Sequence, residues 1–88
     1  MLITADYSAG RLTIHLEGEL DHHSARRGMA DIERLLDEYM PRDAILDMSA
    51  LTFMDSAGIG FLIGRYKKAA RLNIPVNICR PDFAADKI

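Results

Sequence analysis

The chain has 88 residues, enough for one small domain, and a chain of this length buries only about 60–65% of the surface that its unfolded form exposes. Hydrophobic residues make up 49% of the sequence and charged residues 27%, as in globular proteins that fold in water. The net charge of −2 argues against a nucleic-acid partner, which needs a basic surface. Cys79 is the only cysteine, so a disulfide framework and a cysteine zinc site are excluded, and a reducing compartment is expected.

The apolar runs are too short for a membrane segment. None approaches the roughly 20 residues that a membrane helix needs. No basic segment followed by an apolar one opens the chain, so no signal peptide is expected. We therefore expect a cytoplasmic location and no membrane partner.

The chain begins with a predicted β-hairpin. Residues 2–7 and 11–18 have the composition of strands, and a Ser-Ala-Gly turn signal separates them. The second strand alternates apolar and polar residues, which predicts one buried and one wetter face. His15 belongs to the wetter face, and we interpret it as a surface residue.

A helix is predicted next. Apolar residues recur at steps of three and four from Ala25 to Tyr39, which places them on one face of an amphipathic helix. Asp21 and Ser24 are both candidates for its N-cap. Pro41 is expected to end it.

The mostly apolar segment 44–48 predicts a short central strand that is covered on both faces. Asp47 is its one charged residue. We expect its carboxylate to accept a hydrogen bond from a backbone N–H of the loop at 49–51, a structural role rather than a catalytic one.

The rest of the chain predicts a helix from about 57 to 72, a fourth strand at 76–79 and a third helix at 83–88. Asn73 is expected to end the second helix in a left-handed conformation. The residues expected on the core face of that helix are Ile59, Leu62, Ile63, Tyr66 and Ala70. The predicted class is α/β: a mixed four-stranded sheet, made of an antiparallel hairpin and a βαβ unit, packs with two main helices and a short C-terminal helix.

Ser56 lies between the third strand and the second helix, where the helix needs its N-cap. A phosphate on this serine would lie at the positive end of the helix dipole, where anions are favoured. Ser56 is therefore a structural cap or a regulated site.

Three glycines, Gly58, Gly60 and Gly64, lie in the first turns of the second helix, and each costs about 0.8–1 kcal/mol relative to alanine. Ser56, Gly60 and Gly64 follow one another at steps of four and form a smooth stripe along one side. The stripe permits close approach of another backbone, either from the same molecule or from a partner protein.

Other chemistry fits less well. A dinucleotide-binding fingerprint needs a third glycine where Ile63 stands, and a serine-hydrolase elbow needs a glycine where Met54 stands. The adjacent His22 and His23 with Asp21 lack the spacing of metal ligands. We expect no catalysis, no cofactor and no metal.

Two segments carry a resemblance to a known family. Residues 54–60, with 64–67 following, closely resemble the signature of bacterial anti-anti-sigma factors, the STAS-domain antagonists of anti-sigma factors. Residues 18–25 look like the loop after the second strand in the same family, notably in its sporulation branch. The resemblance covers roughly residues 2–80 and implies one STAS domain over residues 1–88.

The resemblance implies a function without catalysis. Such proteins bind an anti-sigma factor that is also a serine kinase and thereby free a sigma factor. The kinase phosphorylates the serine that matches Ser56, and a PP2C-type phosphatase reverses this. The implied partner-binding residues are Asp21, His22, His23, Ser24, Asp55, Ala57, Gly58, Ile59 and Gly60.

The chain departs from the family in length, because family members usually continue beyond the third helix. We expect that a homodimer, a domain swap or a partner would then cover the uncovered sheet edge. The alternative function is that of a STAS-domain adaptor subunit in a bacterial lipid-transport ATPase or in a stress-signalling complex.

Overall fold

The computed structural model describes residues 1–79, with the side chains of residues 59, 62, 63, 65 and 66 left out of the description. Four strands and two helices follow one another in the order β1, β2, α1, β3, α2, β4. Their bounds are Leu2–Ser8 for β1, Arg11–Leu20 for β2, His22–Tyr39 for α1, Asp43–Met54 for β3, Ser56–Arg71 for α2 and Val76–Cys79 for β4. The predicted helix at 83–88 lies outside the described residues.

The sheet is mixed, as predicted from the sequence. Its strand order is β1-β2-β3-β4. β1 and β2 pair antiparallel as a hairpin, whereas β3 runs parallel to both β2 and β4. Parallel neighbours require crossover connections, and the two helices supply them. The α/β class and the arrangement of hairpin plus βαβ unit are confirmed.

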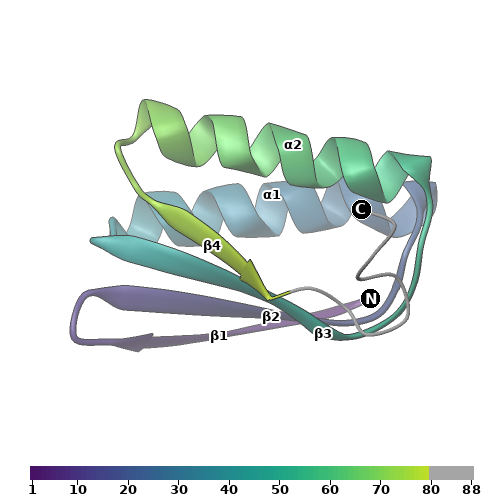
Figure 1. The fold of residues 1–88 in the computed structure, drawn as a ribbon, viewed down its shortest axis with the longest axis horizontal. Helices are drawn as coiled ribbons and strands as arrows, with labels where there is room; N and C mark the ends of the chain where they lie inside the picture. The colour runs from purple at the N-terminus through teal and green to yellow at the C-terminus, as the bar shows by residue number, and fades with distance from the viewer. Residues whose placement is uncertain (80–88) are drawn as a thin grey trace.

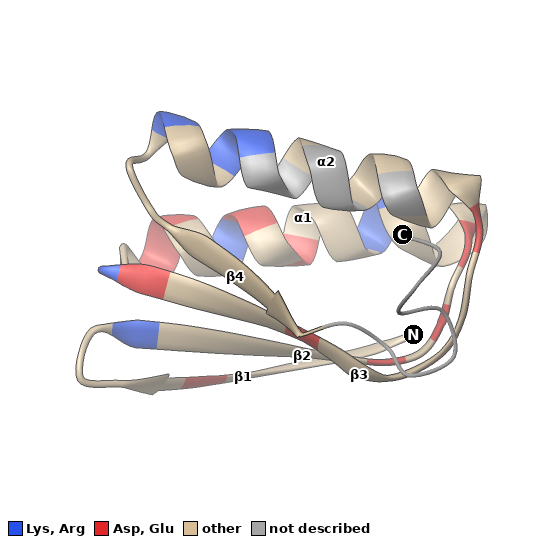
Figure 2. Cartoon of the chain, viewed as in Figure 1, with Lys and Arg blue, Asp and Glu red and all other residues tan. Residues whose placement is uncertain are grey.

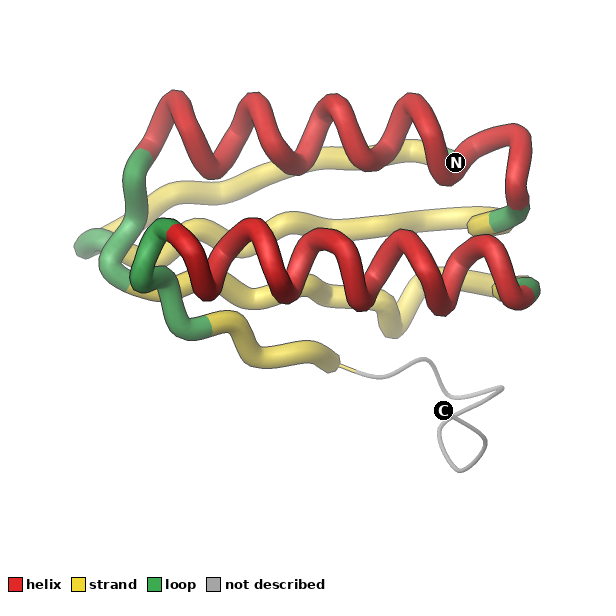
Figure 3. Tube along the Cα trace, turned by 90° about the horizontal axis from the view of Figure 1, so that it is seen from above, coloured by secondary structure: helices red, strands yellow, loops and turns green. Residues whose placement is uncertain are grey.

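Both helices lie on the same face of the sheet and run side by side along it (Figure 1). The view from above shows the two helices side by side over the strands (Figure 3). Of the described elements, no helix lies on the opposite face of the sheet (Figure 1). An exposed ion pair joins the helices, with Lys68 Nζ 3.4 Å from Asp37 Oδ1. The molecule therefore has two layers, one of helices and one of strands.

The core lies between these two layers. Alternate residues of β2 and β3 point into it, and α1 contributes a stripe at helical spacing. The largest of its fully buried side chains are Phe61, Leu12, Ile14, Leu16, Leu20, Ile32 and Met48. Tyr39, predicted on the core face of α1, is 43% exposed and stacks on Tyr7 with ring centroids 5.0 Å apart.

The predicted core face of α2 was wrong at Ala70. The side chains of the other four residues predicted there, Ile59, Leu62, Ile63 and Tyr66, lie outside the description. Phe61 and Ala69 are the buried side chains, 2% and 1% exposed, whereas Ala70 is exposed. Phe61 and Ala69 are eight residues apart, about two turns, and therefore share one side of the helix. The periodicity argument failed here because apolar residues occupy most positions of this helix and mark no single face.

Strand β3 is much longer than the segment 44–48 predicted from apolar residues. It continues to Met54 because β2 also continues, to Leu20, and offers hydrogen-bond partners to its backbone. Residues 49–52 stay in the strand, with exposed side chains at 49, 50 and 52 and the side chain of Leu51 buried. Pairing between neighbouring strands, which is not visible in local composition, sets this length.

The ends of the helices follow the sequence signals closely. α1 ends at Tyr39, and Met40 adopts a left-handed conformation with φ 44° while its N–H donates to Leu36 (2.9 Å). Asn73 after α2 is left-handed as predicted, with φ 59°. In the described part of the chain, no helix is long and apolar enough to cross a membrane.

Candidate partner-binding site

Two strand-to-helix junctions lie side by side at one end of the sheet. Leu20, the last residue of β2, pairs with Met54, the last residue of β3. One step further, the backbone N–H of Asp55 donates to the carbonyl oxygen of Leu20 across 3.4 Å. These two contacts place the segment at Asp21 beside the segment at Asp55 and Ser56.

Asp21 is the N-cap of α1. Its Oδ1 accepts hydrogen bonds from the backbone N–H groups of His23 and Ser24, both at 3.0 Å. Ser24 completes a capping box, because its Oγ accepts from the backbone N–H of Asp21 at 3.0 Å. The N–H of Ser24 lowers the pKa of the Asp21 carboxyl below its ordinary value. Asp21 therefore holds the junction in shape and stays anionic at neutral pH.

Asp55, not Ser56, is the N-cap of α2, which corrects the prediction from sequence. The Oδ1 of Asp55 accepts from the N–H of Gly58 at 3.1 Å, and the residue has extended backbone angles. Ser56 is the first residue of the helix and is exposed. A carboxylate caps as well as a hydroxyl does, so the sequence allowed either residue to take this place.

The exposed position of Ser56 suits modification. Its hydroxyl is not required as a cap, and the first turn of a helix presents free N–H groups and a partial positive charge. Asp55 already uses the N–H of Gly58. A phosphate on Ser56 would thus lie near the positive end of the helix and beside the Asp55 carboxylate.

The glycines of α2 divide into two kinds. Gly58 is buried, and a Cβ there would lie 3.0 Å from the carbonyl oxygen of Leu20. A Cβ on Gly60 or Gly64 would meet no described atom within 4 Å, apart from the helix's own neighbouring backbone. Within the described part of the chain, the stripe at Gly60 and Gly64 therefore packs against neither the sheet nor α1.

The other predicted site residues lie around these junctions. His22 and His23 are exposed at the start of α1, with ring centroids 3.9 Å apart. Ala57 is half-buried in the first turn of α2, and Ile59 follows in the same helix with its side chain outside the description. Among the described residues, no group of three or more His, Cys, Asp or Glu side chains could hold a metal ion.

A pocket of about 350 Å³ opens beside the start of α1. Its lining consists of Met1, Ile3, Glu19, Asp21, His23, Ser24, Arg27, Gly28 and Asp31. Reasoning from sequence had found only the three residues at 21, 23 and 24. Arg27 stands four residues after His23, one helical turn along the same face, and this spacing was the available signal for it.

Acidic positions mark the strand ends that lead into the two junctions, whereas the described Lys and Arg positions of α2 lie in its second half (Figure 2). α1 carries charges of both signs along its length (Figure 2). Lys68 and Arg71 occupy the last turn of α2, where cations complement the helix dipole. An added anion near Ser56 would therefore enter surroundings that are already acidic.

Comparison with known proteins agrees with this geometry. A curated relative, the anti-sigma F factor antagonist of Paenibacillus polymyxa, is 34% identical over 65 residues, which are 74% of this chain and 56% of that protein. The chain thus spans little more than half the length of this relative.

Two solved structures of the antagonist SpoIIAA resemble the fold. The unphosphorylated form superposes with a TM-score of 0.73 at 26% identity and covers 92% of this chain and 74% of its own. The phosphorylated form, from Bacillus, superposes with a TM-score of 0.67 at 26% identity and covers 85% and 68%. The family model of the STAS domain matches residues 3–87, so the chain belongs to the STAS domain family.

Proposed function

We propose that this protein is an anti-sigma factor antagonist controlled by phosphorylation. Its unphosphorylated form binds an anti-sigma factor that is also a serine kinase and so frees a sigma factor. The kinase phosphorylates Ser56 and inactivates the protein, and a PP2C-type phosphatase restores it. The names of the relative from Paenibacillus polymyxa and of SpoIIAA support the antagonist role, and a phosphorylated form of SpoIIAA is known.

The exposed Ser56 at the first position of α2 is the observation that carries the proposal. It follows Asp55, the N-cap of α2. The backbone N–H of Asp55 donates to the carbonyl oxygen of Leu20, the residue that directly precedes Asp21. A kinase can reach such a hydroxyl without unfolding the helix. A phosphate formed there needs no rearrangement of the cap, because Asp55 makes the capping bond.

The proposed contact surface joins three parts: the loop of residues 21–24, the junction of residues 55–57 and the outward-facing Gly60. Gly60 gives a partner backbone close access, because a Cβ on it would point into open space. Gly58 contributes indirectly, since its missing side chain lets the two junctions pack together. The surface is thus smooth at α2 and polar at the loop.

Charge explains how phosphorylation would turn binding off. A phosphoserine adds about −1.5 to −2 charges at neutral pH. Asp55 lies beside the phosphate, and Asp21 lies on the neighbouring junction, so the complex must bring three anionic groups together against a partner. A loss of about 3 kcal/mol through repulsion and desolvation would weaken binding roughly a hundredfold. The free protein keeps its fold because the helix N-terminus favours the anion.

The first test is phosphate transfer. The protein is incubated with ATP and the anti-sigma F factor that the relative from Paenibacillus polymyxa antagonises, and the modified residue is located by mass spectrometry of peptides. We expect one phosphate, on Ser56. The variant Ser56→Ala should take none, whereas Ser8→Ala, which removes an exposed hydroxyl in the hairpin, should be modified normally. Phosphate on another residue, with Ser56 unmodified, would refute the proposed switch.

The second test is binding of the same anti-sigma factor by titration calorimetry. Ser56→Ala should bind like the unmodified protein, and Ser56→Asp should bind at least tenfold more weakly. Ser8→Asp adds the same charge to the hairpin, at the end of the sheet away from the start of α2 (Figure 1). It should bind normally. Equal affinities for Ser56→Asp and Ser8→Asp would contradict the proposal that negative charge at Ser56 weakens binding.

A further inference from the structure

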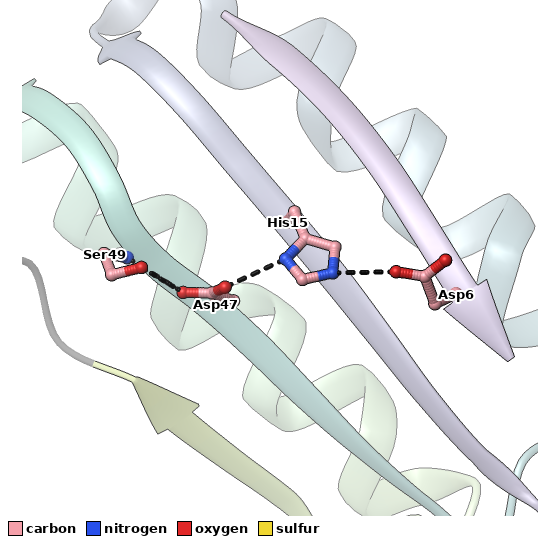
Figure 4. Close-up of polar contacts among 4 residues, drawn as sticks. All are labelled: Asp6, His15, Asp47 and Ser49. Atoms are coloured by element: carbon pink, nitrogen blue, oxygen red, sulfur yellow. Dashed lines mark hydrogen bonds and ion pairs between the residues drawn. The ribbon is translucent and has the colours of Figure 1, made fainter. Parts of the chain in front are cut away.

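The face of the sheet away from the helices carries a chain of polar contacts that lies away from the proposed partner surface. Both helices cover the other face (Figure 1), and alternate side chains of a strand point to opposite faces. His15 stands in the middle, with its side chain 37% exposed. Asp6 from β1 and Asp47 from β3 flank it, and Figure 4 shows the three side chains in a row.

Both ring nitrogens of His15 face a carboxylate. Nδ1 lies 2.8 Å from Asp47 Oδ2, and Nε2 lies 3.0 Å from Asp6 Oδ2. The second oxygen of Asp47 is also used, because Oδ1 accepts from the Ser49 Oγ at 2.6 Å and from the Ser49 N–H at 3.0 Å. This continuous chain links three strands and was not foreseen from the sequence, which indicated only the bond between Asp47 and the segment after it.

Only the protonated ring satisfies this geometry. A neutral imidazole has one N–H donor, so its other nitrogen would present a lone pair to a carboxylate oxygen. The imidazolium donates at both nitrogens and makes two charge-assisted hydrogen bonds. The arrangement of Asp6, His15 and Asp47 therefore stabilises the ring with its added proton.

The contact lies at a β-bulge. His15 pairs with Asp47, but Glu17, two residues on, pairs with Ala50, three residues on. β3 thus holds one extra residue here, and the bonds from Ser49 to Asp47 close the irregularity. Beyond the bulge the two strands continue directly to the paired junctions of the candidate site.

We propose that His15 forms a pH-dependent clasp, which holds β1, β2 and β3 together at this bulge when protonated and releases them when it loses the proton. The clasp makes the stability of the sheet, and the register of the segments that lead into the partner-binding junctions, respond to pH near neutrality. It is independent of whether Ser56 is phosphorylated.

The remaining charged groups around the ring do not oppose its charge. Arg11 is held by Asp43 through two hydrogen bonds of 3.0 and 3.1 Å and is thereby neutralised. Glu17 follows on the same face of β2, and Cys79 of β4 stands opposite Asp47. The hydrogen bond that the His15 ring donates to Asp47 raises the pKa of His15 above its ordinary value of 6.5, and the bond that it donates to Asp6 adds to this.

The sign of the effect follows from linkage. The pKa of His15 is higher in the folded than in the unfolded chain, so folding is favoured fully below pH 6.5. That stabilisation is lost as the pH rises through the folded pKa. Both ion pairs are partly exposed, with Asp6 at 81% and Asp47 at 26%, so the effect is modest and Asp47 is the stronger partner.

Urea unfolding at pH 5.5 and pH 8.5 tests the clasp. We expect the folding equilibrium constant of the unaltered protein to fall by about threefold to tenfold between these values, as for two partly exposed ion pairs. His15→Gln should lose most of this dependence. His22→Gln, which removes an exposed imidazole at the start of α1, should keep it. Equal pH dependence in His15→Gln and the unaltered protein would overturn the proposal.

An NMR titration of the His15 ring keeps the proposal testable if His15→Gln folds poorly. The midpoint should lie above 6.5, the ordinary value. Asp47→Asn should lower that midpoint, and Asp6→Asn should lower it less, because Asp6 is far more exposed. Asn can still accept the bonds from Ser49, so the bulge is preserved. A midpoint at or below 6.5, or one unchanged by Asp47→Asn, would contradict a clasp.

Discussion

Gly58 of α2 and Leu20 of β2 approach so closely that a Cβ on the glycine would lie 3.0 Å from the carbonyl oxygen of Leu20. The same Cβ would lie 2.5 Å from Cγ of Met54. The same carbonyl oxygen accepts the N–H of Asp55. Gly58 is therefore the point at which the two junctions meet, and its lack of a side chain allows the Asp21 loop to stand beside Ser56.

Gly58→Ala should destabilise the protein by up to about 2 kcal/mol. Forcing a methyl group against backbone costs about 1–3 kcal/mol, and the better helix propensity of alanine returns a little under 1 kcal/mol. Met54 can move aside, but the Leu20 carbonyl cannot without disturbing the pairing of β2 with β3. Thermal unfolding measures the change, with Gly64→Ala as the matched control. A gain in stability for Gly58→Ala would show that the junctions do not pack this tightly.

Gly60→Ala should separate stability from binding. A Cβ there meets open space, so the helix gains about 0.8–1 kcal/mol and Tm rises by about 4–8 °C. If Gly60 contacts the anti-sigma factor, the added methyl group should raise the Kd about tenfold. Gly64→Ala, one turn beyond the proposed surface, should gain stability and bind normally. Unchanged binding by Gly60→Ala would remove Gly60 from the proposed surface.

Alanine substitution should lower the stability of the protein at Asp55 but leave it almost unchanged at Ser56. Asp55→Ala removes the N-cap bond to Gly58 and should cost about 0.5–2 kcal/mol. Asp55→Asn should cost much less, since asparagine caps equally well. Ser56→Ala should change the free energy of unfolding by less than about 0.5 kcal/mol, because its hydroxyl caps nothing. Urea unfolding distinguishes these outcomes, and a large loss in Ser56→Ala alone would restore Ser56 as the cap.

Much of the fold was predictable because local signals and tertiary structure agree. The alternation in β2 predicted its buried face, and the spacing of apolar residues in α1 predicted Ala25, Ile32 and Leu36 in the core. The left-handed conformation of Asn73, which ends the second helix, was also predicted from the sequence. In each case the local sequence pattern and the tertiary structure favour the same placement of the residue.

The rest depends on pairing between distant segments. The length of β3 and the position of its bulge depend on pairing with β2, and no local sequence pattern predicts that pairing. His15 looked like an ordinary surface residue because its partners, Asp6 and Asp47, are 9 and 32 residues away in sequence. The choice of Asp55 over Ser56 as cap reflects the place where β3 stops pairing, and both residue types would have been suitable caps.

Among the described residues, three carboxylates have lowered pKa values and stabilise the folded chain on the acid side of its pH range. The N–H of Ser24 lowers the pKa of Asp21, the guanidinium of Arg11 that of Asp43, and the hydroxyl of Ser49 that of Asp47. Each is ionised at neutral pH and stabilised in the folded chain. Because their folded pKa values lie below the ordinary 3.8, their contribution is complete above that pH and disappears as the pH falls through the folded values.

Urea midpoints should therefore fall steeply once the pH drops below about 4, the unfolded carboxyl range. Asp43→Asn should flatten this acid limb, because an asparagine cannot lose its partner by protonation. Glu38→Gln is the matched control, since Glu38 makes only an exposed 3.6 Å contact with Arg34, and its acid limb should match that of the unaltered protein. If the urea midpoint of Asp43→Asn falls with pH as steeply as that of the unaltered protein, the ion pair of Arg11 with Asp43 adds nothing to stability. This is common for exposed ion pairs. The acid sensitivity would then belong to Asp21 and Asp47, which accept backbone N–H bonds that unfolding must break.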